Sequence, residues 1–141
     1  MAAQANTPKV LDVGQCDFDH GNISRILSGR FGAAVERCHG SEEAMRAVAQ
    51  GEYDLVLVNR IFDRGGEEGL KLIARLHSSV EAGKRRVPVM LVSNFSDAQE
   101  QAVKAGAVKG FGKAGLESEA TMLLLEEFLG AKRDPAQAKL S

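Results

Sequence analysis

The stretch that most constrains the fold is Tyr53-Asp54-Leu55-Val56-Leu57-Val58-Asn59-Arg60. Four consecutive apolar residues, Leu55 to Val58, lie between a polar entry and the amide of Asn59. An unbroken Val and Leu run of this kind is typical of a strand buried on both faces, and such strands belong mostly to parallel sheets covered by helices. Functional loops in these sheets follow the carboxyl ends of the strands. We therefore expect Asn59 to lie at the functional edge of a central strand.

Strand and helix patterns alternate along the rest of the chain. Besides the 53–60 stretch, the predicted strands are 9–13, 33–38, 87–93 and 108–112. The first predicted helix is capped by Asp17 or Asp19 and ended by Gly29 and Gly32, and the second runs from Ser41 towards Gly51. The third carries Leu70, Ile73, Ala74, His77 and Val80 on one face, the fourth runs from a Ser96 cap to Ala105, and the fifth spans about 116–129. This order predicts an α/β fold with a parallel sheet and helices on both faces.

Composition excludes several classes of function. The chain has 141 residues, enough for one domain with a proper core, and a formal net charge of −1 gives no electrostatic basis for nucleic-acid binding. No apolar run reaches membrane-spanning length and the N-terminus lacks a signal-peptide pattern, so we expect a cytoplasmic protein that binds no membrane. The expected organisation is a disordered leader (1–8), one domain (9–130) and a flexible C-terminal tail (131–141).

Three short motifs occur in an informative order. The first is Tyr53 to Val58, the second is Pro88-Val89-Met90-Leu91-Val92-Ser93, and the third is Ala105-Gly106-Ala107 with Lys113 six residues after Ala107. In this order they resemble the receiver domain of two-component response regulators, over roughly residues 9–129. The resemblance implies a flavodoxin-like, doubly wound, five-stranded parallel sheet of order 2-1-3-4-5 with five helices.

The resemblance also implies a chemistry that this chain lacks. A receiver accepts a phosphoryl group on an aspartate and binds Mg²⁺ through that carboxylate, an acidic pair after the first strand, and a backbone carbonyl two residues past the acceptor. Here the acceptor position is Asn59, and the acidic pair falls on Gly14 and Gln15, or on Gln15 and Cys16 when aligned from the following helix. Since Mg²⁺ requires oxygen ligands that include carboxylates, the chain looks like a pseudo-receiver, and we expect no cofactor.

Two polar positions of the receiver site remain. Ser93 and Lys113 occupy the positions that contact the phosphoryl oxygens in the family. Lys113 either donates to the Asn59 carbonyl oxygen or projects into solvent, and the sequence leaves both open. The aromatic switch residue of the family falls on Gly110, with Phe111 next, so we expect Phe111 to pack in the core and the usual switch to be absent.

Asp12 and Asp17 are the candidate substitute acids. Asp12 lies inside the first predicted strand, where an unpaired charge would cost several kcal/mol or take up a proton. It therefore needs a partner, either a backbone donor, Lys113 or an arginine. A rebuilt Mg²⁺ site from Asp12 and Asp17 is an alternative to a structural aspartate plus a helix cap.

Two cysteines and two histidines form a rival candidate site. Cys16 and His20 follow the first predicted strand, and Cys38 and His39 follow the second. If these strands are neighbours, the four side chains suit tetrahedral zinc, although neither half has the usual ligand spacing. The alternatives are a Cys16–Cys38 disulfide, or two buried thiols and two loop histidines.

The function that the sequence favours is a stand-alone pseudo-receiver. It would serve, without being an enzyme, as a phosphorylation-independent protein–protein interaction module in two-component-like signal transduction. Its partner would be a histidine kinase or another signalling protein, docked on the 96–130 face, which is also a candidate homodimer surface. The alternatives are a metal or small-ligand sensor that uses the loops at the strand ends, and an atypical phosphoacceptor with a relocated acid.

Overall fold

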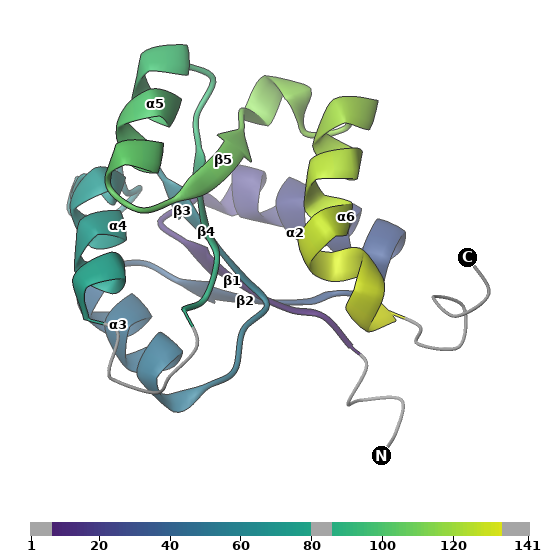
Figure 1. The fold of residues 1–141 in the computed structure, drawn as a ribbon, viewed down its shortest axis with the longest axis horizontal. Coiled ribbons are helices and arrows are strands. Elements are labelled where there is room, and N and C mark those ends of the chain that lie inside the picture. The colour runs from purple at the N-terminus through teal and green to yellow at the C-terminus, as the bar shows by residue number, and fades with distance from the viewer. Residues whose placement is uncertain (1–6, 80–85, 134–141) are drawn as a thin grey trace.

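Five parallel strands form a single sheet in the order β2-β1-β3-β4-β5 (Figure 1). The computed structural model describes residues 7–79 and 86–133. The strands are β1 (Lys9–Val13), β2 (Ala34–Cys38), β3 (Leu55–Asn59), β4 (Val89–Val92) and β5 (Val108–Phe111). The predicted fold class and strand order are confirmed.

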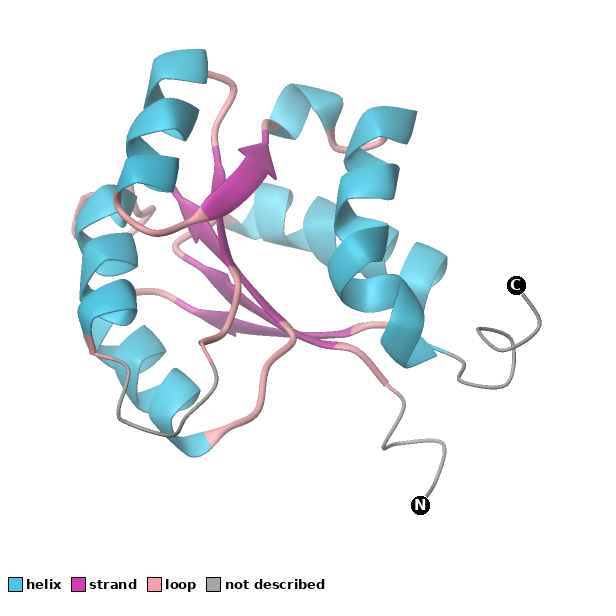
Figure 2. Cartoon of the chain, viewed as in Figure 1, coloured by secondary structure: helices cyan, strands magenta, loops and turns pink. Residues whose placement is uncertain are grey.

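Helices cover both faces of this sheet (Figure 2). One face carries α2 (Asp17–Phe31) and α6 (Glu119–Arg133), and the other carries α3 (Ser41–Gln50), α4 (Gly69–Ser78) and α5 (Ser96–Lys104). A short 3₁₀ turn, η1 (Lys113–Gly115), connects β5 to α6. The sheet therefore separates two apolar cores, one on each side.

The central strand β3 contributes to both cores. Leu55 and Leu57 pack towards α2 and α6, whereas Val56 and Val58 pack towards α3, α4 and α5, and all four are fully buried. Alternation is expected because successive side chains of a strand point to opposite faces. Each such side chain stabilises the fold by roughly 1.5–3 kcal/mol when removed from water. Asn59, which is half-buried, ends this strand directly after the four buried residues.

Two helix starts differ from the prediction. The N-cap of α2 is Cys16, whose Sγ accepts a hydrogen bond from the Asp19 backbone N–H at 3.5 Å, and neither Asp17 nor Asp19 has this role. The N-cap of α5 is Phe95, without a side-chain hydrogen bond, and not Ser96. The observed cap lies one position before Asp17 and three before Asp19 in α2, and one position before Ser96 in α5.

Helix ends and the inward face of α4 also differ. Gly32, at φ 66°, ends α2, while Gly29 lies inside the helix and is not its end. In α4 the buried residues include Leu72, Ile73 and Leu76, whereas Ala74 and His77 are exposed, contrary to the predicted face. Val80 lies outside the described residues.

The domain extends slightly beyond its predicted limits. Pro8 is buried, and its carbonyl accepts a hydrogen bond from the Ala34 N–H at 2.8 Å. At the other end, α6 continues to Arg133, three residues past the predicted boundary at 130. The rest of the predicted leader (1–6) and of the predicted tail (134–141) lies outside the described residues.

The pairing of β4 with β5 contains an irregularity at Gly110. Met90 pairs with Val108 and Val92 pairs with Phe111, so between these two pairs β5 contains one more residue than β4. The Gln99 side chain fills the gap: Nε2 donates to the Leu91 carbonyl at 2.8 Å, and Oε1 accepts from the Gly110 N–H at 3.1 Å. Gly110, which falls at the position of the family's switch aromatic, thus lies in a bulge of an edge strand.

We predict that Gly110→Ala destabilises the fold. An added Cβ would overlap the Leu91 carbonyl oxygen and approach Gln99 Oε1, and overpacking of this kind costs about 1–3 kcal/mol in the free energy of unfolding. Gly29→Ala is the matched control, because its added Cβ meets nothing within 4 Å and the residue is exposed in α2. We expect this control to raise stability by about 0.5–1 kcal/mol. Equal effects in urea denaturation would contradict the bulge as described.

Candidate functional site

The carboxamide of Asn59 joins two loops at the functional edge. Its Nδ2 donates to the Gly14 carbonyl at 3.0 Å and to the Ile61 carbonyl at 2.8 Å, and its Oδ1 accepts from the Arg60 N–H at 2.9 Å. The β1–α2 loop and the β3–α4 loop are therefore held by one NH₂ group. Because an ionised carboxylate has no proton to donate, an aspartate could not make the two bonds to these carbonyls.

Gly14 leaves no room for an acidic side chain. Its φ is 78°, and an added Cβ would overlap the ring of Phe62, which is buried. The Gly14 N–H donates to the Cys38 carbonyl at 2.9 Å, and its carbonyl accepts a second bond from the Asp63 N–H at 2.9 Å. The first position of the acidic pair is thus occupied by the packing of Phe62.

Gln15 and Cys16 supply no carboxylate either. Gln15 is fully buried, and its carboxamide has no hydrogen-bond partner within the described part of the chain. Cys16 caps α2. Neither alignment of the acidic pair, on Gly14 and Gln15 or on Gln15 and Cys16, therefore places a carboxylate at this site.

Lys113 forms an ion pair with Asp19. The Lys113 Nζ lies 2.7 Å from Asp19 Oδ2, and the Cys16 thiol donates to the same oxygen at 3.3 Å. Although partial burial acts to raise it, the hydrogen bonds from Lys113 and Cys16 hold the pKa of Asp19 below its ordinary value. Both interpretations of Lys113 are therefore wrong. Asp19, considered from sequence only as a helix cap, is the counter-ion.

Ser93 and Phe111 belong to the local structure of β4 and β5. The Ser93 Oγ accepts a hydrogen bond from the Phe95 N–H at 3.2 Å and is almost entirely buried. Phe111 is buried in the core beneath α2 and α6, as predicted. Gly110, which falls at the family's aromatic switch position, carries no side chain and lies in the bulge between β4 and β5.

Asp12 is fully buried and is paired with His20. The Asp12 Oδ2 lies 2.7 Å from His20 Nδ1, whereas Oδ1 has no partner in the described residues. Burial raises the pKa of the Asp12 carboxyl, and the contacts with His20 oppose that shift. The predicted need for a partner is confirmed: the closest partner is His20 of α2, which the sequence did not indicate, and the charge of Arg37 also acts to lower the pKa that burial raises.

Asp17 lies at the surface and is paired with Arg37. The Arg37 Nη2 contacts Asp17 Oδ1 at 2.8 Å and also donates to the Gln15 carbonyl at 2.9 Å. Asp12 and Asp17 are thus held by different partners. Across residues 7–79 and 86–133, no group of three His, Cys, Asp or Glu side chains could hold a metal ion.

The four-residue zinc candidate does not assemble in the described structure. Cys38 packs into the core beneath α3 and α4, where burial raises the pKa of its thiol to about 12. His20 instead contacts Asp12, and the β1 neighbour of Asp12 on the same face, Val10, packs against α2 and α6. Cys16 and Cys38 are both free thiols. The candidates separate because Cys38 points to the sheet face opposite that of His20.

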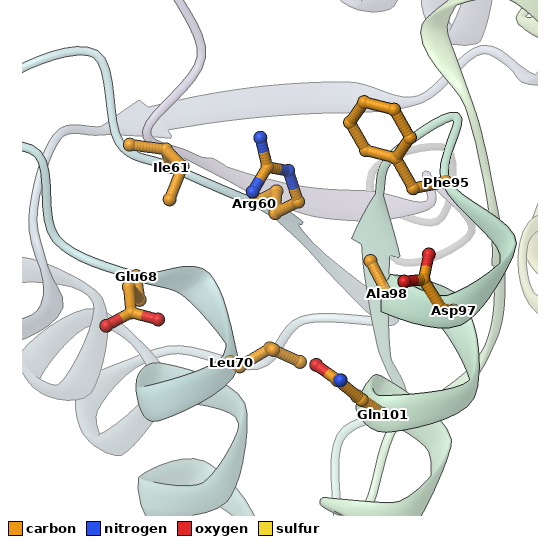
Figure 3. Close-up of a pocket in the computed structure, with 8 residues that line it drawn as sticks. All are labelled: Arg60, Ile61, Glu68, Leu70, Phe95, Asp97, Ala98 and Gln101. Carbon is orange, nitrogen blue, oxygen red and sulfur yellow. The ribbon is translucent and has the colours of Figure 1, made fainter.

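A pocket of about 360 Å³ lies past the carboxyl end of β3, next to the N-terminal ends of α4 and α5 (Figure 3). It is lined by the residues that follow β3 and by the first turns of α4 and α5: Arg60, Ile61, Glu68, Leu70, Phe95, Asp97, Ala98 and Gln101. No sequence motif indicated this pocket, because its walls come from three segments without a common spacing. Phe95, an aromatic residue three positions after the end of β4, is 57% exposed in the structure.

Comparison with solved structures shows the fold of response-regulator receiver domains. One neighbour is a putative response regulator from Chloroflexus aurantiacus (TM-score 0.69, 17% identity, 88% of this chain and 99% of that one). Another is the beryllofluoride-activated receiver domain of RstA from Klebsiella pneumoniae (TM-score 0.68, 20% identity, 86% and 97%). A third, from Burkholderia pseudomallei, contains a phosphorylated aspartic acid (TM-score 0.64, 20% identity, 95% and 73%).

The comparisons at the level of sequence found no match. No protein-family model matches the chain, and no curated protein matches it. Among the described helices none combines the length and apolar character needed to cross a membrane.

The buried Asp12 predicts a pH dependence of stability. Its folded pKa lies above the ordinary value of 3.8, so its favourable contribution is complete below the unfolded pKa and is lost as pH rises through the folded pKa. We expect the free energy of unfolding of the native chain to fall, relative to Asp12→Asn, as pH rises from about 4 towards neutrality.

Asp17→Asn is the control of opposite sign. Its hydrogen bond with Arg37 lowers the pKa of Asp17, so that contribution is present above the unfolded pKa and is lost as pH falls. Chemical denaturation across this pH range measures both variants. A native chain that gains stability over Asp12→Asn with rising pH would show that pairing, and not burial, dominates at Asp12.

Proposed function

We propose that the chain is a pseudo-receiver: a non-enzymatic, phosphorylation-independent interaction module in two-component-like signalling in the cytoplasm. The observation that carries the proposal is the Asn59 carboxamide. Its NH₂ group binds the Gly14 and Ile61 carbonyls, the second of which is the carbonyl that would coordinate Mg²⁺ in a receiver. A hydrogen-bond donor thus occupies the place where the resemblance implies a cation.

The surroundings of Asn59 support the same proposal. Lys113 already has a carboxylate partner in Asp19 at 2.7 Å, so a phosphoryl group would have to displace an existing ion pair. Gly14 cannot accept an acidic side chain without moving Phe62. These contacts favour one conformation of the functional edge without a covalent modification.

The face formed by α5, β5 and α6 supports protein docking (Figure 1). β5 is an edge strand, and Val103 on α5 and Leu123 on α6 are 49% and 59% exposed. An unpaired strand edge and exposed apolar side chains are both suited to a protein partner. We propose that a histidine kinase, another signalling protein or a second copy of the chain binds here.

The first test is phosphorylation. Incubation with acetyl phosphate and Mg²⁺ should leave the intact mass unchanged for the native chain. Asn59→Asp should also remain unmodified, because positions 14 and 15 still supply no carboxylate. The RstA receiver domain, which is activated by beryllofluoride, serves as the competent control. A mass increase of one phosphoryl group on the native chain would contradict the proposal and indicate a relocated acceptor acid.

The second test concerns the docking face. Leu123→Glu should weaken self-association, measured by sedimentation equilibrium, by about tenfold or more, since a buried unpaired carboxylate costs over 1.4 kcal/mol. Phe18→Ser is the matched control, because Phe18 is an exposed apolar residue at the start of α2, outside this face. If the native chain is monomeric, the same two variants are compared for binding to a cognate kinase. Equal effects of the two variants would place the interface elsewhere.

A further inference from the structure

We propose that the pocket lined by Arg60, Glu68, Phe95 and Asp97 receives an arginine side chain from a protein partner. The pocket lies between the β3–α4 loop and the first turns of α4 and α5 (Figure 3). The inference rests on the proposed interaction role and adds to it a second contact surface with a defined chemical preference. No docking on the α5–β5–α6 face is needed for it.

Apolar groups form the rim and floor of the pocket. Ile61 and Phe95 are 40% and 57% exposed, and both line it. Leu70 and Ala98 contribute further apolar surface (Figure 3). The methylene stem of an arginine buries against such surface while its charged end remains near polar groups.

The charges of the lining favour a cation. Glu68 and Asp97 stand on opposite sides of the pocket, whereas Arg60 is the one cationic residue of the lining (Figure 3). Within the described residues Asp97 forms no ion pair, and the one ion pair of Glu68 is with Lys71, at 3.6 Å and exposed to solvent. Exposed pairs of this kind contribute little. Two carboxylates against one guanidinium leave the side chains of the lining net negative, against the partial positive charge of the two helix N-termini.

The position of Arg60 does not cancel this preference. Its guanidinium lies over the ring of Phe95, 5.1 Å from the centroid, and so already has a favourable partner. In Figure 3 it points towards Ile61 and Phe95, away from the Glu68 and Asp97 carboxylates. An anionic occupant would meet two carboxylates, and a purely apolar one would desolvate them without compensation.

Arginine fits this arrangement better than lysine. The acceptors are spread around the pocket, on Glu68, Asp97 and the carboxamide of Gln101. A planar guanidinium offers five donors in a fixed fork, whereas an ammonium is a compact point charge. The dispersed acceptors therefore match a guanidinium.

The test is an amide NMR titration of the full chain with the capped peptide acetyl-Leu-Arg-Leu-amide. We expect saturable shifts at Leu70, Phe95 and Gln101. The peptide with citrulline in place of arginine has nearly the same shape without the charge, and should bind about tenfold more weakly or not at all. Asp97→Asn should weaken the arginine peptide by a similar factor. Glu100→Gln, an exposed change on the same helix outside the pocket, should have no effect.

Three results would overturn the inference: no shifts in the pocket, equal binding of the citrulline peptide, or tighter binding of acetyl-Leu-Glu-Leu-amide. None of them bears on phosphorylation. Loss of association in Leu123→Glu together with a silent pocket would leave the proposed function standing without this site. Phosphorylation of the native chain together with binding of the arginine peptide would contradict the proposed function and leave the arginine site standing.

Discussion

Two hydrogen bonds from one amide group hold the functional edge of this domain together. The Asn59 NH₂ group binds carbonyls from two loops, at Gly14 and Ile61. In the receiver arrangement that the resemblance implies, a cation and several carboxylates would connect the same loops. A neutral contact needs neither metal nor counter-charge, and each bond contributes about 0.5–1.5 kcal/mol net. Ile61, whose carbonyl accepts one of these bonds, also lines the neighbouring pocket, so the Asn59 contact also positions part of the pocket wall.

Charges near this edge are compensated locally. Lys113 is paired with Asp19, and Asp12 with His20, so two pairs connect α2 to β1 and to the turn after β5. On the other side of β4, Gln99 joins the irregular pairing of β4 and β5 through its carboxamide. Side-chain contacts thus fix the segments that a phosphorylation switch would have to move. We infer that partners recognise one persistent surface.

Hydrophobic patterns predicted the α/β class, and the receiver resemblance implied the strand order that the sheet has. The cost of burying charge predicted that Asp12 needs a partner. The sequence did not identify His20 as that partner. The side chain of α2 that faces β1 depends on where the helix begins, and it begins after the Cys16 cap. The inward face of α4 was wrong for a related reason: Leu72 and Leu76 form an apolar stripe as plausible as the predicted one. Lys113–Asp19 and the pocket join distant segments, so no local spacing could indicate them.

The most direct measurement is the side-chain amide resonance of Asn59, with through-bond couplings to carbonyl carbons. The account predicts two resolved, exchange-protected NH₂ protons with couplings to the Gly14 and Ile61 carbonyls, unchanged by excess Mg²⁺ and beryllofluoride. Solvent-averaged Asn59 protons without these couplings, or signals that shift when the two ions are added, would contradict it. In that case the edge would be an open site and not one closed by its own amide.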